Sequence, residues 1–150
     1  MIRQEIIPAL PVSPIEFEEK DDGTCSAVAF RDKHFYKDHL NIPETYRGMN
    51  VREIGFYAFS ASSIQGVTIS NGVTTIGEGA FMSCENLTNV TIPSSVTTIG
   101  MLAFAYCYEL NSITFEGTVT QWNSIYLDYD WNYGAPAKYV QCSGGDVPLN

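Results

Sequence analysis

The strongest constraint in this chain is a stretch of sequence that occurs twice in succession. Val73–Ile92 reads VTTIGEGAFMSCENLTNVTI and Val96–Phe115 reads VTTIGMLAFAYCYELNSITF, so equivalent residues lie 23 positions apart. The two copies agree at their apolar and small positions, and they differ at the positions that lie in between. A period of this length is typical of repeat proteins, in which each unit stacks on its neighbours because it cannot bury its apolar face alone.

A third, shorter copy precedes these two. Val51–Ile69 reads VREIGFYAFSASSIQGVTI, with Ser62 where the later copies have Cys84 and Cys107. This copy has one residue fewer between Ser62 and Ile64 than the later copies have at the equivalent place. Three consecutive units predict a short solenoid.

Each unit is expected to contain two short strands. The alternating apolar residues before Pro93 predict a strand at the end of a copy, and Ile76 marks a second, shorter one. Equivalent strands should pair in parallel, one rung per coil. The segments EGAF and MLAF suit a single helical or 3₁₀ turn. We expect Gly77 and Gly100, in the turn after the second strand, to adopt positive φ.

The repeat also predicts what fills the core. Phe59, Phe81 and Phe104 occupy one repeat position and should form an aromatic column. Cys84 and Cys107 share another position, and we expect stacked free thiols there instead of a disulfide, because neighbouring coils do not supply disulfide geometry automatically. The predicted fold class is α/β: a short leucine-rich-repeat solenoid with parallel β rungs, short helical or 3₁₀ turns, and caps at both ends.

The pattern Ile-Gly-x-x-Ala-Phe-x-x-Cys-x-x-Leu-x-x-Val-x-Ile-Pro resembles the BspA-like leucine-rich repeat of bacterial and protozoan surface proteins. The resemblance covers Leu40 to Ile125. Leu40–Gly55 is similar to the family's entry into its first full repeat, and Phe115–Ile125 and Lys138–Asp146 resemble a closing segment. The resemblance implies a binding or adhesion module and no known chemistry.

The chain has the length of one domain, within which we distinguish four segments. Pro8, Pro11 and Pro14 oppose regular structure in the first of them. A strand is expected from about Thr24 to Phe30, followed by a solvated turn at 31–37. The segments are an extended N-terminal lead at 1–22, an N-terminal cap and entry repeat at 23–50, three repeat units at about 51–72, 73–95 and 96–115, and a closing segment at 116–150.

The charge is negative and unevenly distributed. The formal net charge is -9, and residues 51–150 hold eight acidic residues but only two basic ones, Arg52 and Lys138. Binding to nucleic acid phosphates requires clusters of Lys and Arg. Direct nucleic-acid binding by the repeats is therefore not expected.

One candidate binding site is the segment YLDYDWNY at Tyr126–Tyr133. Tyr and Trp give rigid contact area with a polar group, and they are enriched at binding hot spots. The alternative is that Trp122, Tyr126 and Trp131 cover the open end of the core, as terminal repeats require. The candidate partner-binding residues are Tyr106, Tyr108, Tyr126, Asp128, Tyr129, Asp130, Trp131 and Tyr133.

A second candidate is the outward face of the predicted sheet. By alternation along the strands it carries small, polar and β-branched residues. They form either a flat docking face for an extended protein or glycan, or a ladder that keeps the sheet soluble and pairs across strands. The candidate residues are Thr68, Asn89, Thr91, Ser112 and Thr114.

No pattern in the chain predicts catalysis, a metal site or a cofactor. His34 and His39 lack the Cys or His spacing of a zinc site, and Asp128 and Asp130 lack the rest of a calcium loop. No nucleophile elbow, phosphate loop or dinucleotide fingerprint occurs. We expect a protein that is not an enzyme.

The sequence leaves the compartment open. Ile6–Val12 is too short and too rich in proline for a secretory signal, and no run of about 20 apolar residues could insert into a membrane. The family resemblance suggests a secreted or cell-surface protein, whereas this N-terminus favours the cytosol or a phage origin.

Three function classes follow, in order of preference. The first is a non-catalytic protein-interaction or adhesion module that binds a protein or glycan, and the second is a small acidic inhibitor of a nucleic-acid-binding protein, of phage origin. The third is a structural subunit that assembles into oligomers through the ends of the solenoid.

Overall fold

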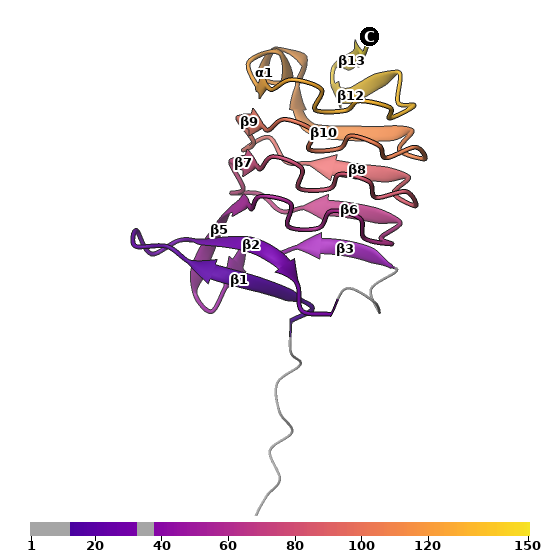
Figure 1. Ribbon diagram of the computed structural model, residues 1–150. Coiled ribbons are helices and arrows are strands. Elements are labelled where there is room, and N and C mark those ends of the chain that lie inside the picture. Colours follow the sequence, from indigo (N-terminus) through magenta and orange to yellow (C-terminus); the bar gives the residue numbers. More distant parts are fainter. Residues whose placement is uncertain (1–12, 33–37) are drawn as a thin grey trace, which may run out of the picture.

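The chain folds into a solenoid whose coils stack along one axis, with a β-hairpin at each end (Figure 1). The structure is a computed structural model, and it describes residues 13–32 and 38–150. Each coil contributes one strand to each of two sheets, and a run of turns forms the third side. The predicted leucine-rich-repeat solenoid is confirmed.

The first sheet has five parallel rungs in the described part of the chain. They are β2 (Cys25–Phe30), β5 (Met49–Ile54), β7 (Thr75–Ile76), β9 (Thr98–Ile99) and β11 (Tyr126–Leu127). β1 (Ile15–Glu19) pairs antiparallel with β2 and closes the N-terminal end of this sheet. β4 (Thr45–Tyr46) forms a hairpin with β5 through Arg47 and Gly48, whose positive φ angles of 49° and 78° fit a two-residue hairpin turn.

The second sheet also has five parallel rungs among the described residues. They are β3 (His39–Ile42), β6 (Gly66–Ile69), β8 (Asn89–Ile92), β10 (Ser112–Thr118) and β12 (Tyr139–Ser143). β13 (Gly145–Pro148) pairs antiparallel with β12 and closes the C-terminal end. Each sheet is thus capped by an antiparallel strand, but at opposite ends of the solenoid (Figure 1).

The parallel rungs continue beyond the three units that the repeat pattern marks. β2 and β3 lie before the first unit, and β11 and β12 lie after the last one. The helix α1 (Val119–Asn123) is inserted between β10 and β11, with Thr118 and Gln121 forming a capping box at its start. This insertion lengthens the last coil. A comparison of the sequence at the regular spacing of 23 residues therefore does not show that the last coil resembles the others.

Part of the predicted N-terminal lead is a paired strand. β1 runs antiparallel to β2, and the two are joined by a turn at Asp22 and Gly23. The backbone N–H and the hydroxyl of Thr24 both donate to the Asp22 carboxylate, at 2.9 Å and 2.7 Å, and these hydrogen bonds lower the pKa of that carboxyl. Residues 33–37 of the predicted turn and residues 1–12 of the lead lie outside the described residues.

The third side is built from turns that hydrogen-bond from one coil to the next. Ala80 N–H donates to the Gly77 carbonyl at 3.2 Å, which is the spacing of a single 3₁₀ turn. Between coils, Phe81 N–H donates to the Ala103 carbonyl at 2.8 Å and Phe104 N–H donates to the Trp131 carbonyl at 2.7 Å. The predicted short turns therefore form a third ladder along the solenoid.

The aromatic column in the core is confirmed. The ring of Phe81 stacks on Phe59 at 5.5 Å and on Phe104 at 5.2 Å, and all three are buried. Trp131 continues the column, with its ring centroid 6.3 Å from that of Phe104. Stacked aromatic rings bury large apolar areas, so this column is a major contribution to stability.

The prediction of positive φ at Gly77 and Gly100 is wrong. Neither glycine is among the residues with positive φ. A Cβ atom on Gly77 would lie 2.7 Å from the Ile54 carbonyl oxygen, and one on Gly100 would lie 2.6 Å from the Glu78 nitrogen. These glycines are required because the backbones of neighbouring coils approach each other closely at this corner.

The expectation of free thiols in the core is confirmed for Cys84 and Cys107. Cys84 Sγ donates to the Phe59 carbonyl at 3.2 Å, and Cys107 Sγ donates to the Phe81 carbonyl at 3.1 Å. The hydrogen bond with Cys84 and burial raise the pKa of the Cys107 thiol. Both thiols are fully buried, so they act as small core side chains.

Candidate functional site

A second column of side chains lies on the turn side, two residues after the buried aromatic column. Its residues bend the chain in the same way, because Ala61, Ser83 and Tyr106 all have positive φ, of 55°, 61° and 59°. Ser83 N–H donates to the Ala105 carbonyl at 2.8 Å, and Tyr106 N–H donates to the Tyr133 carbonyl at 2.7 Å. We call Ala61, Ser83 and Tyr106 the outer column, and Gly134, with a φ of 79°, holds the equivalent position in the last turn.

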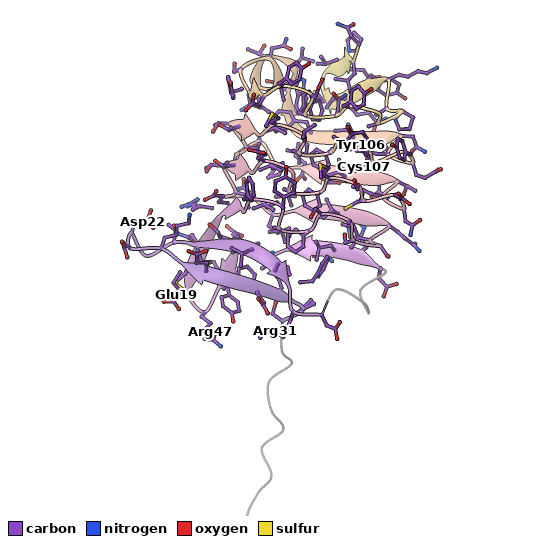
Figure 2. The ribbon with its side chains drawn as sticks, in the orientation of Figure 1. Glu19, Asp22, Arg31, Arg47, Tyr106 and Cys107 are labelled. Atoms are coloured by element: carbon purple, nitrogen blue, oxygen red, sulfur yellow. The ribbon has the colours of Figure 1, made fainter. Side chains whose placement is uncertain are left out.

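Three tyrosines gather at the C-terminal half of this column. The ring of Tyr106 lies 6.3 Å from that of Tyr108 and 5.5 Å from that of Tyr133, both edge to face. Tyr108 and Tyr133 are each 56% exposed. Figure 2 shows Tyr106 in the upper half of the solenoid, away from the charged residues labelled around β1 and β2. We call Tyr106, Tyr108 and Tyr133 the tyrosine cluster.

Gly134 leaves room for one of these rings. It follows Tyr133 and has a positive φ of 79°. A Cβ atom at this position would lie 3.4 Å from Cε1 of Tyr108. The last turn therefore leaves space for the ring of Tyr108 beside Gly134.

The other two predicted tyrosines are exposed but lie apart from the cluster. Tyr126 is 63% exposed on β11, where it pairs with Thr98 in the first sheet. Tyr129 is 73% exposed at the start of the last turn, where its carbonyl accepts from Leu102 N–H. Among the described residues, no ring contact joins Tyr126 or Tyr129 to the cluster. The segment YLDYDWNY thus divides between two sides of the solenoid.

The core-cover interpretation is confirmed for Trp131 and Trp122 and is wrong for Tyr126, which is exposed. Trp131 is only 7% exposed, and its ring is 5.8 Å from that of Trp122, which is itself buried. Trp122 packs in turn on Phe115 at 5.4 Å. Because the two tryptophans cover the end of the core, Trp131 offers little area to a partner, and we leave it out of the candidate surface.

The two aspartates of the segment support the last turn. The Asp128 carboxylate accepts a hydrogen bond from Tyr129 N–H at 2.7 Å, and the Asp130 carbonyl accepts one from Tyr133 N–H at 3.1 Å. Asp130 has a positive φ of 53°, which Asp tolerates better than most residues. Both residues therefore help to hold the tyrosines in place, in addition to carrying negative charge.

A hollow lies beside the tyrosine cluster, on the two preceding coils. Its floor is made of small residues because the outer column has Ala61 and Ser83 where the next coil has Tyr106. Its volume is about 290 Å³. The residues that line it are Ala61, Ser62, Ser63, Ser83, Glu85 and Asn86. Tyr108 occupies, one coil later, the repeat position of Glu85, so the tyrosines continue the surface where the hollow ends.

The sequence analysis missed this hollow and one exposed aromatic pair. Ala61, Ser83 and Tyr106 share one repeat position, so aligning the copies could have revealed a step from small to large side chains. Phe56 is 69% exposed and contacts the ring of Tyr57 at 4.4 Å. Its repeat equivalents Glu78 and Met101 are polar or flexible, and such a departure was also visible in the sequence.

The turn side is electrostatically negative. No Lys or Arg occurs between Arg52 and Lys138, whereas Glu78, Glu85 and Glu109 lie in the turns. The ion pair found in the described part of the chain lies elsewhere, between Lys20 Nζ and Glu53 Oε2 at 3.0 Å. This pair raises the pKa of Lys20, and it lies beside β2 and β5 of the first sheet. The acids of the turn side are not neutralised by described basic residues.

The candidate sheet face is an in-register polar ladder. Thr68, Thr91 and Thr114 pair across β6, β8 and β10, and Asn89 pairs with Ser112. All five candidate residues are half-buried. At the ends of the ladder, Thr68 Oγ1 lies 2.7 Å from a ring nitrogen of His39, and the Thr114 hydroxyl donates to the Gln141 amide oxygen at 3.4 Å. The ladder thus satisfies part of its own hydrogen-bonding capacity.

The described residues contain no arrangement suited to a metal ion. No three His, Cys, Asp or Glu side chains come close enough together in residues 13–32 and 38–150 to hold one. His39 contacts Thr68, and His34 lies outside the described residues. In the same part of the chain, no helix has the length and apolar character that crossing a bilayer would require.

Stacked parallel rungs, short turns and a period of 23 residues define a leucine-rich-repeat solenoid. Residues 28–129 match the BspA type leucine rich repeat region in six copies, and the chain belongs to this family. Its repeats and fold are generally non-catalytic and typically serve protein interaction. No curated protein matches the chain.

Solved bacterial structures share the fold. A leucine-rich repeat protein from Bacteroides capillosus is 28% identical, with a TM-score of 0.72 over 90% of this chain and 98% of its own. One from Bacteroides ovatus is 26% identical, with a TM-score of 0.69 over 89% of this chain and 37% of its own. A leucine rich cell surface protein from Faecalibacterium prausnitzii, at 22% identity and a TM-score of 0.59, covers 92% of this chain and 43% of its own, and shows the fold alone.

Proposed function

We propose that this chain is a non-catalytic module that binds a protein partner through the tyrosine cluster. The observation that carries the proposal is the contact among Tyr106, Tyr108 and Tyr133, which come from two coils and leave two rings more than half exposed. Exposed aromatic rings that are already ordered lose little side-chain entropy on binding. They are therefore well suited to be the anchor residues of an interface.

The demands of folding do not account for these rings. Trp122 and Trp131 already cover the end of the core. Earlier coils carry Ala61 and Ser83 at the position of Tyr106, so a tyrosine is not needed to build the turn. A cluster that neither fills the core nor builds the turn is better explained by contact with a partner.

The other candidate roles have less support. The sheet face uses part of its hydrogen-bonding capacity within the ladder, at His39 and Gln141. The acidic residues are spread along the turns without a dense ladder that could imitate a phosphate backbone. An adhesion role, which the family resemblance implies, would use the tyrosine cluster on a macromolecule at a cell surface.

The test is capture of partners by the purified chain from a cell-surface extract and from a bacterial lysate, at low and high salt. A Tyr108→Ala/Tyr133→Ala variant should lose the partners that the original chain retains, even at high salt, because apolar contacts are not screened. The matched control is Tyr126→Ala/Tyr139→Ala, which removes two exposed rings elsewhere. Equal retention by all three proteins would overturn the proposal.

A further inference from the structure

We infer that the hollow beside the tyrosine cluster takes a lysine or arginine side chain of the protein partner. The inference rests on the proposed function, because it assigns a partner chemistry to the same surface. The partner would lie across the turn side, with a basic residue in the hollow and neighbouring residues on Tyr106 and Tyr108.

The shape of the hollow suits one long side chain. Ligand pockets for small molecules begin at roughly 300 Å³, and the hollow, at about 290 Å³, lies at the low end of that range. Ala61 and Ser83 leave its floor open, whereas the next coil fills the equivalent space with Tyr106. A side chain that enters the hollow would therefore lie next to the coil that carries Tyr106.

The polar groups of the hollow suit a cation. Ser63 and Asn86 supply oxygen atoms that can accept hydrogen bonds, and Glu85 supplies the charge. Within the described part of the chain, the Glu85 carboxylate forms no ion pair or hydrogen bond, so it is available to a partner. Lysine and arginine side chains also interact favourably with the faces of tyrosine rings.

The surrounding charge favours the same class of partner. The turn side has no lysine or arginine between Arg52 and Lys138, and Glu78 and Glu109 flank the hollow along the sequence. An acidic partner would be repelled by these residues, whereas a basic segment would be attracted before contact.

The experiment is selection of displayed random dodecapeptides on the intact chain, followed by measurement of Kd for the selected peptides. We expect enrichment of lysine and arginine and depletion of acidic residues. Glu85→Gln should weaken the selected peptides about threefold to fivefold, as expected for one exposed ion pair. Ser83→Tyr should weaken them about tenfold or more, because it fills the hollow.

Two features make the variants informative. Tyr106 already occupies the position equivalent to Ser83 with the same positive φ, so the repeat itself accommodates Ser83→Tyr. Glu116→Gln is the matched control for Glu85→Gln, since it removes one exposed carboxylate on β10, away from the hollow. We expect this control to change Kd by less than about twofold.

The outcomes separate this inference from the proposed function. Selected peptides that require Tyr108 and Tyr133 but show no basic enrichment would overturn the inference and leave the proposed function standing. Equal losses of peptide affinity in Glu85→Gln and Glu116→Gln would also overturn it, because the negative charge of the whole surface, and not Glu85 in particular, would then attract the peptides. Peptides that bind independently of the tyrosines would contradict the proposed function itself.

Discussion

Two columns of side chains follow the turn side of the solenoid, two residues apart in each of three coils, and they differ in how much their residues vary. The inner column is aromatic and buried, with Phe59, Phe81 and Phe104, and Trp131 of the last turn packs on its end. The outer column changes from small residues to tyrosine, with Ala61, Ser83 and Tyr106, and Tyr133 of the last turn packs beside Tyr106. The same backbone ladder supports both columns.

The difference shows where a repeat protein is free to vary. An inner position has neighbours above and below, so a change of volume there is felt by the whole column. An outer position faces solvent, so its side chain is constrained only by the backbone. Departures from the repeat on the outer column can therefore create a binding surface without loss of the fold.

The largest effect should come from opening the inner column. Phe81→Ala removes a ring that stacks on Phe59 at 5.5 Å and on Phe104 at 5.2 Å. We expect a loss of about 3 to 5 kcal/mol in the free energy of unfolding, which denaturant titration measures. A loss below about 1 kcal/mol would mean that the column does not hold the coils together.

A smaller effect is expected where neighbouring backbones meet. Gly77→Ala places a Cβ atom 2.7 Å from the Ile54 carbonyl oxygen, so the two coils must separate. Overpacking of this kind costs about 1 to 3 kcal/mol, again read from denaturant titration. Thr74→Ala, at a half-buried position on the adjacent strand edge, is the control and should cost less. Equal costs for the two changes would contradict the close-approach explanation of this glycine.

The tyrosine cluster should contribute little to stability. Tyr108→Ala/Tyr133→Ala removes two rings that are each 56% exposed. We expect a loss below about 1 kcal/mol in the free energy of unfolding, together with a loss of more than about tenfold in partner affinity. Denaturant titration and a binding isotherm on the same preparation test both parts. A large loss of stability would show that the tyrosines belong to the core after all.

The smallest effect is expected at the ion pair between Lys20 and Glu53, whose side chains are 43% and 36% exposed. The pair raises the pKa of Lys20, so its contribution is present at neutral pH and is lost as the pH rises above 10.5. Lys20→Met should therefore cost about 0.2 to 1 kcal/mol at pH 7. The difference in the free energy of unfolding between Lys20→Met and the original chain should become smaller in alkaline solution. A difference that grows there would contradict the expected effect of the ion pair on the pKa of Lys20.

The sequence predicted most of the fold because the fold repeats. Regular spacing marked the strands of the three central coils and the column of Phe59, Phe81 and Phe104. The last turn was missed, because α1 moves it out of the regular spacing. Leu102 and Tyr106, with φ angles of 60° and 59°, correspond to Asp130 and Gly134, with φ angles of 53° and 79°, 28 positions later instead of 23.

The candidate site was harder to predict, because it depends on which coils lie side by side. The tyrosine-rich segment was identified, but only the structure separates Tyr133 in the cluster from Tyr126 on the first sheet. The hollow arises from small side chains at Ala61 and Ser83, and no sequence motif marks a hollow of this kind. The role of Gly77 was misjudged because close approach between coils cannot be read from one strand.

The most direct test of this division of roles is a paired measurement of unfolding midpoint and partner affinity on two variants. Phe81→Leu alters the inner column, and Tyr108→Ala/Tyr133→Ala alters the tyrosine cluster at the end of the outer column. The first should lower the midpoint and leave Kd for a captured partner unchanged, and the second should raise Kd more than about tenfold with little change in midpoint. If both variants shift both quantities together, the two columns do not have separate roles, and the account is contradicted.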